Sequence, residues 1–158
     1  MSVSSLGPIR FAGVSQVTAS LGANDPEVGT VVREGDEEYI FVYNAGNSEI
    51  PPSFGATVSA VTGYSVTVSS VTGVDFLVGV CKHATLTTGT YGWLVRKGFV
   101  VVEMEADNSC AAGQLLALAA DGEFALKSAS TQYPANAVGK SMEAITSGAS
   151  GSAYISVF

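Results

Sequence analysis

The chain has 158 residues, of which 90 are Gly, Ser, Ala, Thr or Val, and only 13% are charged, against about a quarter in ordinary soluble domains. The excess of Val and Thr over Leu and Lys argues against a helical bundle or coiled coil and favours a mainly β protein. The net charge of −7 has the wrong sign for gripping a phosphate backbone, and the apolar runs are far shorter than the ~20 residues that cross a bilayer. We therefore expect neither a nucleic-acid partner nor a membrane.

Residues 1–37 are predicted to form an extended arm with one or two short strands, because turn signals containing Gly and Pro interrupt apolar residues that follow no period. This arm has an acidic end: between Asp25 and Glu49, seven acidic residues accompany the single base Arg33. The acids lack the spacing of a calcium-binding loop, so we interpret them as a solvated surface rather than a metal site. The N-terminus has no basic start followed by an apolar stretch, so no secretory signal is visible and synthesis in a cytoplasm is expected.

Residues 38–158 are predicted to form strands, with two hairpins as the most distinct signals. Around Thr62-Gly63, apolar positions alternate at Val58, Ala60, Val66 and Val68. Around Asp121-Gly122, they alternate at Leu116, Leu118, Phe124 and Leu126. The second signal is the stronger one, because Asp and Gly tolerate the positive φ angles of a type I′ turn.

The two hairpins match at an offset of 58 residues, and other segments match at offsets of 59 to 61. The correspondences pair Gly55 with Gly113, Val58 with Leu116, residues 39–41 with 100–102, and residues 78–79 with 138–139. This pattern predicts an internal duplication with repeats 38–97 and 98–158. Because each unit of about 60 residues is too small to bury enough surface alone, the two are expected to share one core.

The sequence of two segments is compatible with either a helix or a strand. Residues 109–118 are rich in Ala and Leu, and residues 134–145 place apolar residues at helical spacing behind Pro134. Gly113 and Gly139 each cost a helix interior about 1 kcal/mol relative to Ala. We therefore favour strands in both segments, with a single helical turn near Pro134.

Catalytic and metal-binding patterns are weak in this sequence. The one histidine, His83, lies two residues from Cys81, which on a strand would place both side chains on one face and allow a thiolate–imidazole pair. No Asn or Asp is spaced to complete a triad, and a zinc site needs three or four ligands. The phosphate-binding GxxxxGK[ST] and the nucleophile motif GxSxG do not occur. We expect no enzyme, cofactor or metal, and Cys81 and Cys110 are interpreted as buried thiols.

The segment YGWLVRKG is the most specific feature of the chain. On a strand, Tyr91, Trp93 and Val95 share one face, while Leu94 and Arg96 share the other. Trp93 is then either part of the core beneath the sheet or a buried anchor between subunits.

This segment belongs to a longer order of motifs. GVCKHATLTTGTYGWLVRKGFVVVEME is followed by AAGQLLALAADGEF and then by NAVGKSMEAITSGASGSAYISVF. With these three motifs in this order, the chain resembles the capsid cement proteins, also called head decoration proteins, of tailed bacteriophages. The resemblance covers residues 76–158 well, residues 38–75 loosely and the arm hardly at all. It implies a small β-barrel or tulip-like sandwich that assembles on the outer face of an expanded icosahedral shell, often as a trimer.

From this resemblance we expect a non-enzymatic virion protein that binds the major capsid protein and stabilises contacts between its copies. The arm is expected to bind the capsid through Leu6, Ile9, Arg10 and Phe11. A homo-oligomer is expected as well, with its contact near Tyr91, Trp93, Tyr154 and Phe158. The alternative is a tail, fibre or surface adhesin module that recognises a host ligand through its Thr-, Ser- and Gly-rich loops and aromatics such as Tyr64 and Tyr91.

Overall fold

A computed structural model describes residues 17–23, 25–59, 64–68, 76–127 and 137–157. The strands of these residues are β1 (Val31–Glu34), β2 (Glu37–Asn44), β3 (Gly55–Val58), β4 (Ser65–Val68), β5 (Leu77–Val80), β6 (Tyr91–Glu103), β7 (Leu115–Leu118), β8 (Phe124–Leu126), β9 (Gly139–Ser141) and β10 (Ser150–Ser156). A three-residue 3-10 turn, Ala120–Gly122, connects β7 and β8. The prediction of an all-β fold is confirmed.

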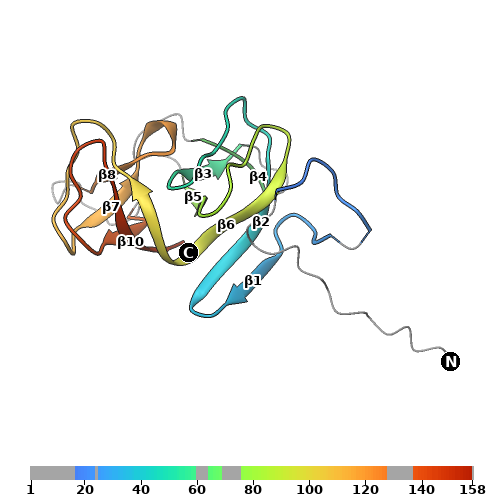
Figure 1. Ribbon diagram of the computed structural model, residues 1–158, viewed down its shortest axis with the longest axis horizontal. Coiled ribbons are helices and arrows are strands. Elements are labelled where there is room, and N and C mark those ends of the chain that lie inside the picture. Colours follow the sequence, from blue (N-terminus) through green and yellow to red (C-terminus); the bar gives the residue numbers. More distant parts are fainter. Residues whose placement is uncertain (1–16, 24, 60–63, 69–75, 128–136, 158) are drawn as a thin grey trace.

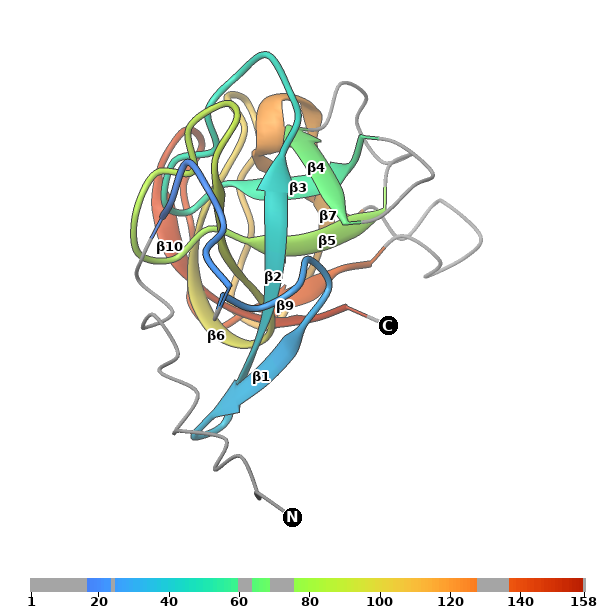
Figure 2. The same ribbon diagram turned by 90° about the vertical axis from the view of Figure 1, so that its right-hand side faces the viewer.

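Five strands close into a barrel, which we call the first barrel. β2 pairs with the first half of β6 and, in parallel, with β4. The circuit continues from β4 to β3, from β3 to β5, and from β5 back to β6. Figure 2 shows β2, β3, β4 and β5 together at the front of this barrel. The expectation of a small β-barrel is therefore confirmed.

The second barrel is formed by the second half of β6 with β7, β8, β9 and β10. β6 pairs with β10, β10 with β9, β9 with β7, and β7 with β8. A single parallel bridge between Met104, directly after β6, and Phe124 of β8 completes the circuit. The long strand β6 thus passes from one barrel into the other, as Figure 1 shows. Gly98 lies at this passage with a φ of 130°, where a Cβ atom would come within 2.8 Å of Glu37.

Both predicted hairpins are present. β3 pairs with β4 and β7 with β8, and Asp121 and Gly122 adopt the positive φ angles, 56° and 82°, that the turn motif predicts. The segments 109–118 and 134–145 contribute β7 and β9 rather than helices. The helical turn expected near Pro134 falls outside the described residues.

The hydrogen-bonded pairs of the two barrels repeat one another. Equivalent contacts are Asn44–Val66 and Met104–Phe124, Ile50–Leu86 and Cys110–Ile145, and Gly55–Val80 and Leu115–Lys140. β2 therefore corresponds to the second half of β6, and β3 corresponds to β7, in both cases at an offset of 60 residues. The predicted offset of 61 for β2 and the predicted offset of 58 for β3 were wrong. The offset of 58 holds between β4 and β8. The paired residues Val58 and Val66 are eight positions apart in the sequence, whereas the equivalent pair Leu118 and Phe124 is six positions apart, so the offset falls by two across the hairpin. An origin by duplication stays a prediction.

The core has three clusters. The inner side of the first barrel holds aliphatic residues of β2, β3, β4 and β6 with Cys81, and the inner side of the second holds residues of β6 to β10 around Phe124. Leu77 and Val80, on the outer side of β5, belong to the cluster of the second barrel. The two barrels therefore pack against each other through a shared apolar contact.

The third cluster lies on the outer side of β2 and β6. It consists of Tyr39, Phe41, Trp93 and Val95, with Val28, Val32 and Tyr91 packed against it. Residues 25–34 cover these side chains, since β1 pairs with β2 and carries Val32. Further upstream, Thr18 exchanges two backbone hydrogen bonds with Tyr91. The described part of the predicted arm, residues 17–23 and 25–37, is thus attached to the first barrel.

Candidate functional site on the second barrel

The structure separates Cys81 from His83. The Cys81 thiol is buried in the first barrel and donates a hydrogen bond to the carbonyl oxygen of Ala84, at 3.1 Å, and burial raises the pKa of the thiol to about 11. His83 is exposed, and its ring stacks on Tyr39 with a centroid distance of 6.1 Å. Among the described residues, no three His, Cys, Asp or Glu side chains converge as metal ligands. This part of the molecule therefore carries no recognisable nucleophile or metal centre.

Trp93 occupies the core position of the two alternatives drawn from the sequence. It is 6% exposed, and its ring lies 4.9 Å from that of Phe41 within the cluster covered by residues 25–34. Tyr91 is half-buried at the border of the same cluster, 6.2 Å from Phe41. Trp93 thus offers little surface to a partner of this chain. Phe158 and the arm residues Leu6, Ile9, Arg10 and Phe11 lie outside the described residues.

The acidic end of the predicted arm is partly used within the fold. Glu37 accepts hydrogen bonds from Lys82 and Tyr39. Burial acts to raise the pKa of Glu37, but these hydrogen bonds and the charge of Lys82 lower it overall. Glu38 pairs with Arg33 at 2.6 Å and with Arg96 at 3.6 Å. These carboxylates hold β1 and β2 against the barrel rather than forming a catalytic pair.

Tyr154, itself half-buried, lies within an otherwise exposed row on the outer face of the second barrel. The row crosses four neighbouring strands and consists of Phe99 on β6, Tyr154 on β10, Lys140 on β9 and Leu115 on β7. Phe99 is 52% exposed and Leu115 45%, and the rings of Phe99 and Tyr154 meet edge to face at 5.1 Å. We call these four residues the exposed row. Val101, on the same face of β6 as Phe99, is 45% exposed and extends its apolar surface.

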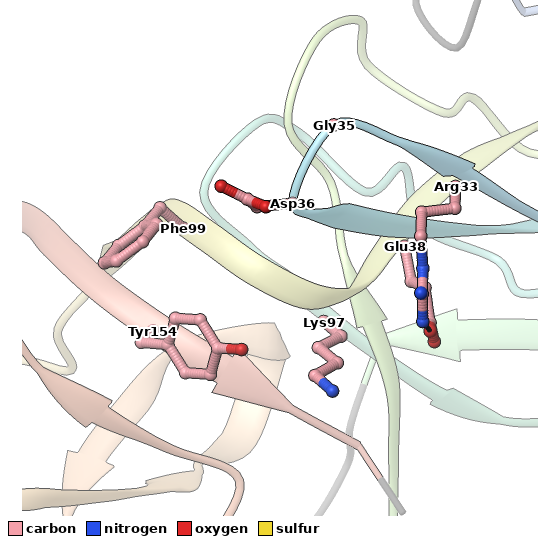
Figure 3. A pocket seen from close by; sticks show the side chains of 7 residues that line it. All are labelled: Arg33, Gly35, Asp36, Glu38, Lys97, Phe99 and Tyr154. Atoms are coloured by element: carbon pink, nitrogen blue, oxygen red, sulfur yellow. Dashed lines mark hydrogen bonds and ion pairs between the residues drawn. The ribbon is translucent and has the colours of Figure 1, made fainter.

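Two hollows flank Tyr154. The first, of about 380 Å³, lies between the β1–β2 turn and the exposed row, and its lining residues are Arg33, Gly35, Asp36, Glu38, Lys97, Phe99 and Tyr154. Figure 3 shows the Tyr154 hydroxyl on the side of Lys97, with Phe99 behind it on β6. The second, of about 390 Å³, is lined by Leu115, Ala137, Val138, Gly139, Lys140, Tyr154 and Ser156. Together with the exposed row they form a shallow, largely apolar surface that suits an extended partner better than a small substrate.

Only some of the charged groups on this surface form ion pairs. Ion pairs between described residues involve Arg33, Lys82 and Arg96, and include neither Lys97 nor Lys140. The neighbouring acid Glu143 accepts a hydrogen bond from the backbone N–H of Ser152, at 2.6 Å. The surface therefore presents apolar groups together with the exposed charged side chains of Arg33, Asp36, Lys97 and Lys140.

Of this surface, the sequence interpretation included Tyr154 but missed Phe99, Leu115 and Lys140. A signal was present in the run FVVVE, which places apolar residues on both faces of one strand. Such a pattern is typical of a strand that is covered on both faces. Here the inner residues Val100 and Val102 are covered, and the outer ones are not.

Comparison with solved structures identifies a protein of similar fold, whereas sequence comparisons find no match. No protein-family model and no curated protein sequence matches the chain. The structure is similar to the solved structure of the N base of the head fibre gp8.5 in bacteriophage phi29, with a TM-score of 0.54 and 13% sequence identity over 75% of this chain and 94% of that one. Among the described residues, no helix has the length and apolar character needed to cross a bilayer. Over three quarters of its length, the chain thus has a fold similar to that of a component of a phage head.

Proposed function

We propose that this chain is a non-enzymatic structural protein of a phage head. It attaches to the outer face of the assembled shell, contacts the major capsid protein and stabilises the contacts between copies of that protein. The observation that carries the proposal is the fold shared with the base of a phage head fibre. The cement-protein resemblance of residues 76–158 supports the same assignment independently of the fold.

The character of the exposed surface also supports this proposal. In monomeric soluble proteins, a contiguous exposed apolar patch larger than a few hundred Å² usually marks a contact with another molecule. Phe99, Val101 and Leu115 are each about half exposed on neighbouring strands, beside Tyr154. A contact repeated over a symmetric shell would stabilise the assembled state by mass action and by effective concentration. A trimer is proposed on the resemblance alone.

The proposal is tested on phage heads prepared without this protein. Purified protein is added back, bound protein is separated by sedimentation, and the resistance of the heads to heat or urea is measured. We expect saturable binding and a higher melting temperature of the shell. Heads that bind no protein, or that bind it with unchanged resistance, would overturn the attachment or the cement role, respectively.

The second candidate is a fibre or adhesin module that recognises a host ligand. The likeness to the N base of a head fibre favours it specifically, because that neighbour is itself part of a fibre. Copy number separates the two functions. A cement protein occupies the shell in hundreds of copies and a fibre in tens, which densitometry of purified virions distinguishes.

A further inference from the structure

The exposed row has a buried counterpart in the first barrel. Equivalent cross-strand pairs form the counterpart row, which consists of Tyr39 on β2, Val95 on β6, Val80 on β5 and Gly55 on β3. All four residues are buried, and Tyr39 is only 3% exposed where its equivalent Phe99 is 52% exposed. The two faces thus have the same strand geometry but opposite exposure.

The residues that bury the counterpart row indicate what kind of structure can bind to a face of this geometry. Beside Tyr39, residues 29–34 pair along the edge of β2, Val28 and Val32 pack against the cluster that contains Tyr39 and Val95, and the His83 ring stacks on Tyr39. Val80 is covered by the apolar cluster of the second barrel. On the second barrel, no described residue occupies the position that Val28 and Val32 occupy on the first. An extended apolar segment is therefore the structural complement of the exposed row.

Because of Lys140, a segment that binds the exposed row must also carry a negative charge. Lys140 stands where the counterpart row has Val80, and it lies between Tyr154 and Leu115. A segment laid across the row would desolvate the ammonium group, which is costly unless a carboxylate pairs with it. Lys97, at the near end of the row, also has no ion pair with a described residue. The complement is thus an extended segment that carries apolar side chains and at least one carboxylate.

The N-terminal segment of this chain does not meet that requirement. Residues 1–16 contain no Asp or Glu, and their one charged side chain is Arg10. Placed on the row, this segment would leave Lys140 unpaired and add a like charge. Residues 1–16 therefore do not supply the carboxylate that Lys140 requires.

We propose that the exposed row is the surface by which the barrel region, separately from the N-terminal arm, attaches to the phage head. It receives an extended segment of the shell protein whose apolar side chains cover Phe99, Tyr154 and Leu115 and whose carboxylate pairs with Lys140. This inference rests on the proposed function and deepens it by naming the surface and the chemistry of its partner.

The test measures binding to heads that lack the protein, with variants of the full chain. Leu115→Ser and Lys140→Glu should each weaken binding about tenfold or more, as expected for central contact residues. Val58→Ser is the apolar control, since Val58 is 46% exposed on the first barrel, and it should stay within about twofold of the wild type. Circular dichroism and melting should show all variants folded, because the altered side chains are exposed.

A second series isolates the charge. Lys140→Arg should bind like the wild type, whereas Lys140→Met should bind more weakly, and this difference should shrink at high salt. Thr88→Glu changes the net charge by the same amount as Lys140→Met, at an exposed turn of the first barrel, and should have no effect. Equal binding by Lys140→Arg and Lys140→Met would overturn the carboxylate partner.

The outcomes separate this inference from the proposed function. If wild-type protein does not bind the heads, both fail. If it binds and Leu115→Ser and Lys140→Glu bind equally well, only the inference fails. If these two variants keep head binding but lose self-association in sedimentation, the exposed row contacts a second copy, which also overturns the inference.

Discussion

The contrast between the two outer faces predicts a large difference in stability between two chemically identical substitutions. Phe41 and Phe99 both point outward from their barrels, but Phe41 is 3% exposed beneath residues 25–34 and Phe99 is 52% exposed. Replacing a buried Phe by Ala costs about 3–5 kcal/mol, because apolar contacts are lost and a cavity remains. Phe41 also loses its ring contacts with Trp93 and Tyr91. We expect Phe41→Ala to lower the free energy of unfolding by about 4 kcal/mol.

For Phe99→Ala the expected loss is much smaller. Complete burial of a Phe side chain contributes about 1.5–3 kcal/mol, and roughly half of this ring is already in contact with water. The edge-to-face contact with Tyr154 adds about 0.5 kcal/mol more, the lower end of the range for aromatic pairs, because both rings are partly exposed. The total is about 1–2 kcal/mol.

Urea unfolding followed by far-ultraviolet circular dichroism measures both losses. With a slope of about 2 kcal/mol per molar urea, the midpoint should fall by about 2 M for Phe41→Ala and by less than about 1 M for Phe99→Ala. Equal shifts, or a larger shift for Phe99→Ala, would refute the conclusion that one face is covered within the chain and the other is bare. If Phe41→Ala does not fold, Phe41→Leu provides the comparison, and it should still lose more stability than Phe99→Leu.

Three further predictions concern the first barrel and the arm. The pKa of Glu37 is lowered from 4.5 in the folded state, so its stabilising effect is present at neutral pH and lost as the pH falls below that value. Glu37→Gln should therefore lower the melting temperature at pH 7, and this deficit should shrink as the pH falls below 4.5; a deficit independent of pH would contradict this. The Cys81 thiol, with its pKa raised to about 11 by burial, should resist iodoacetamide at pH 8 until the protein unfolds. Alkylation of the native protein at the rate of the unfolded chain would disprove its burial. Deletion of residues 2–16 should leave both barrels folded and weaken attachment to heads, with Phe11→Ala reproducing more of that loss than Arg10→Ala; unchanged head occupancy after the deletion would exclude an anchoring arm. The deletion stops at residue 16 because Val17 packs against the first barrel.

Much of the local structure could be predicted because its causes are local. The hairpin at Asp121-Gly122 follows from two residues that tolerate positive φ angles, and both adopt them. Leu116, Leu118 and Phe124 point into the core as their alternation predicts. The face shared by Tyr91, Trp93 and Val95 is also observed.

The alignment of the repeats was less accurate, for a reason that is also physical. Small and β-branched residues recur at many positions of this chain, so several offsets give similar matches. An offset wrong by one residue turns every side chain of a strand to the other face. The hydrogen-bonded pairs settle the offset at 60 for β2 and β3 and at 58 for β4.

By itself, the sequence determined that the chain is rich in strands, where its clearest turn lies and which residues of the second hairpin alternate toward a core, whereas Val58 of the first hairpin is exposed. It did not determine which outer face is covered, because Tyr39 and Phe41 in one strand and Phe99 and Val101 in another show the same apolar alternation. That distinction depends on where residues 25–34 pack, and their apolar side chains Val28 and Val32 pack against the outer cluster of the first barrel. Coverage is a property of contacts between segments far apart in the chain, so only the tertiary structure decided that Phe99, Tyr154, Lys140 and Leu115 form an exposed surface.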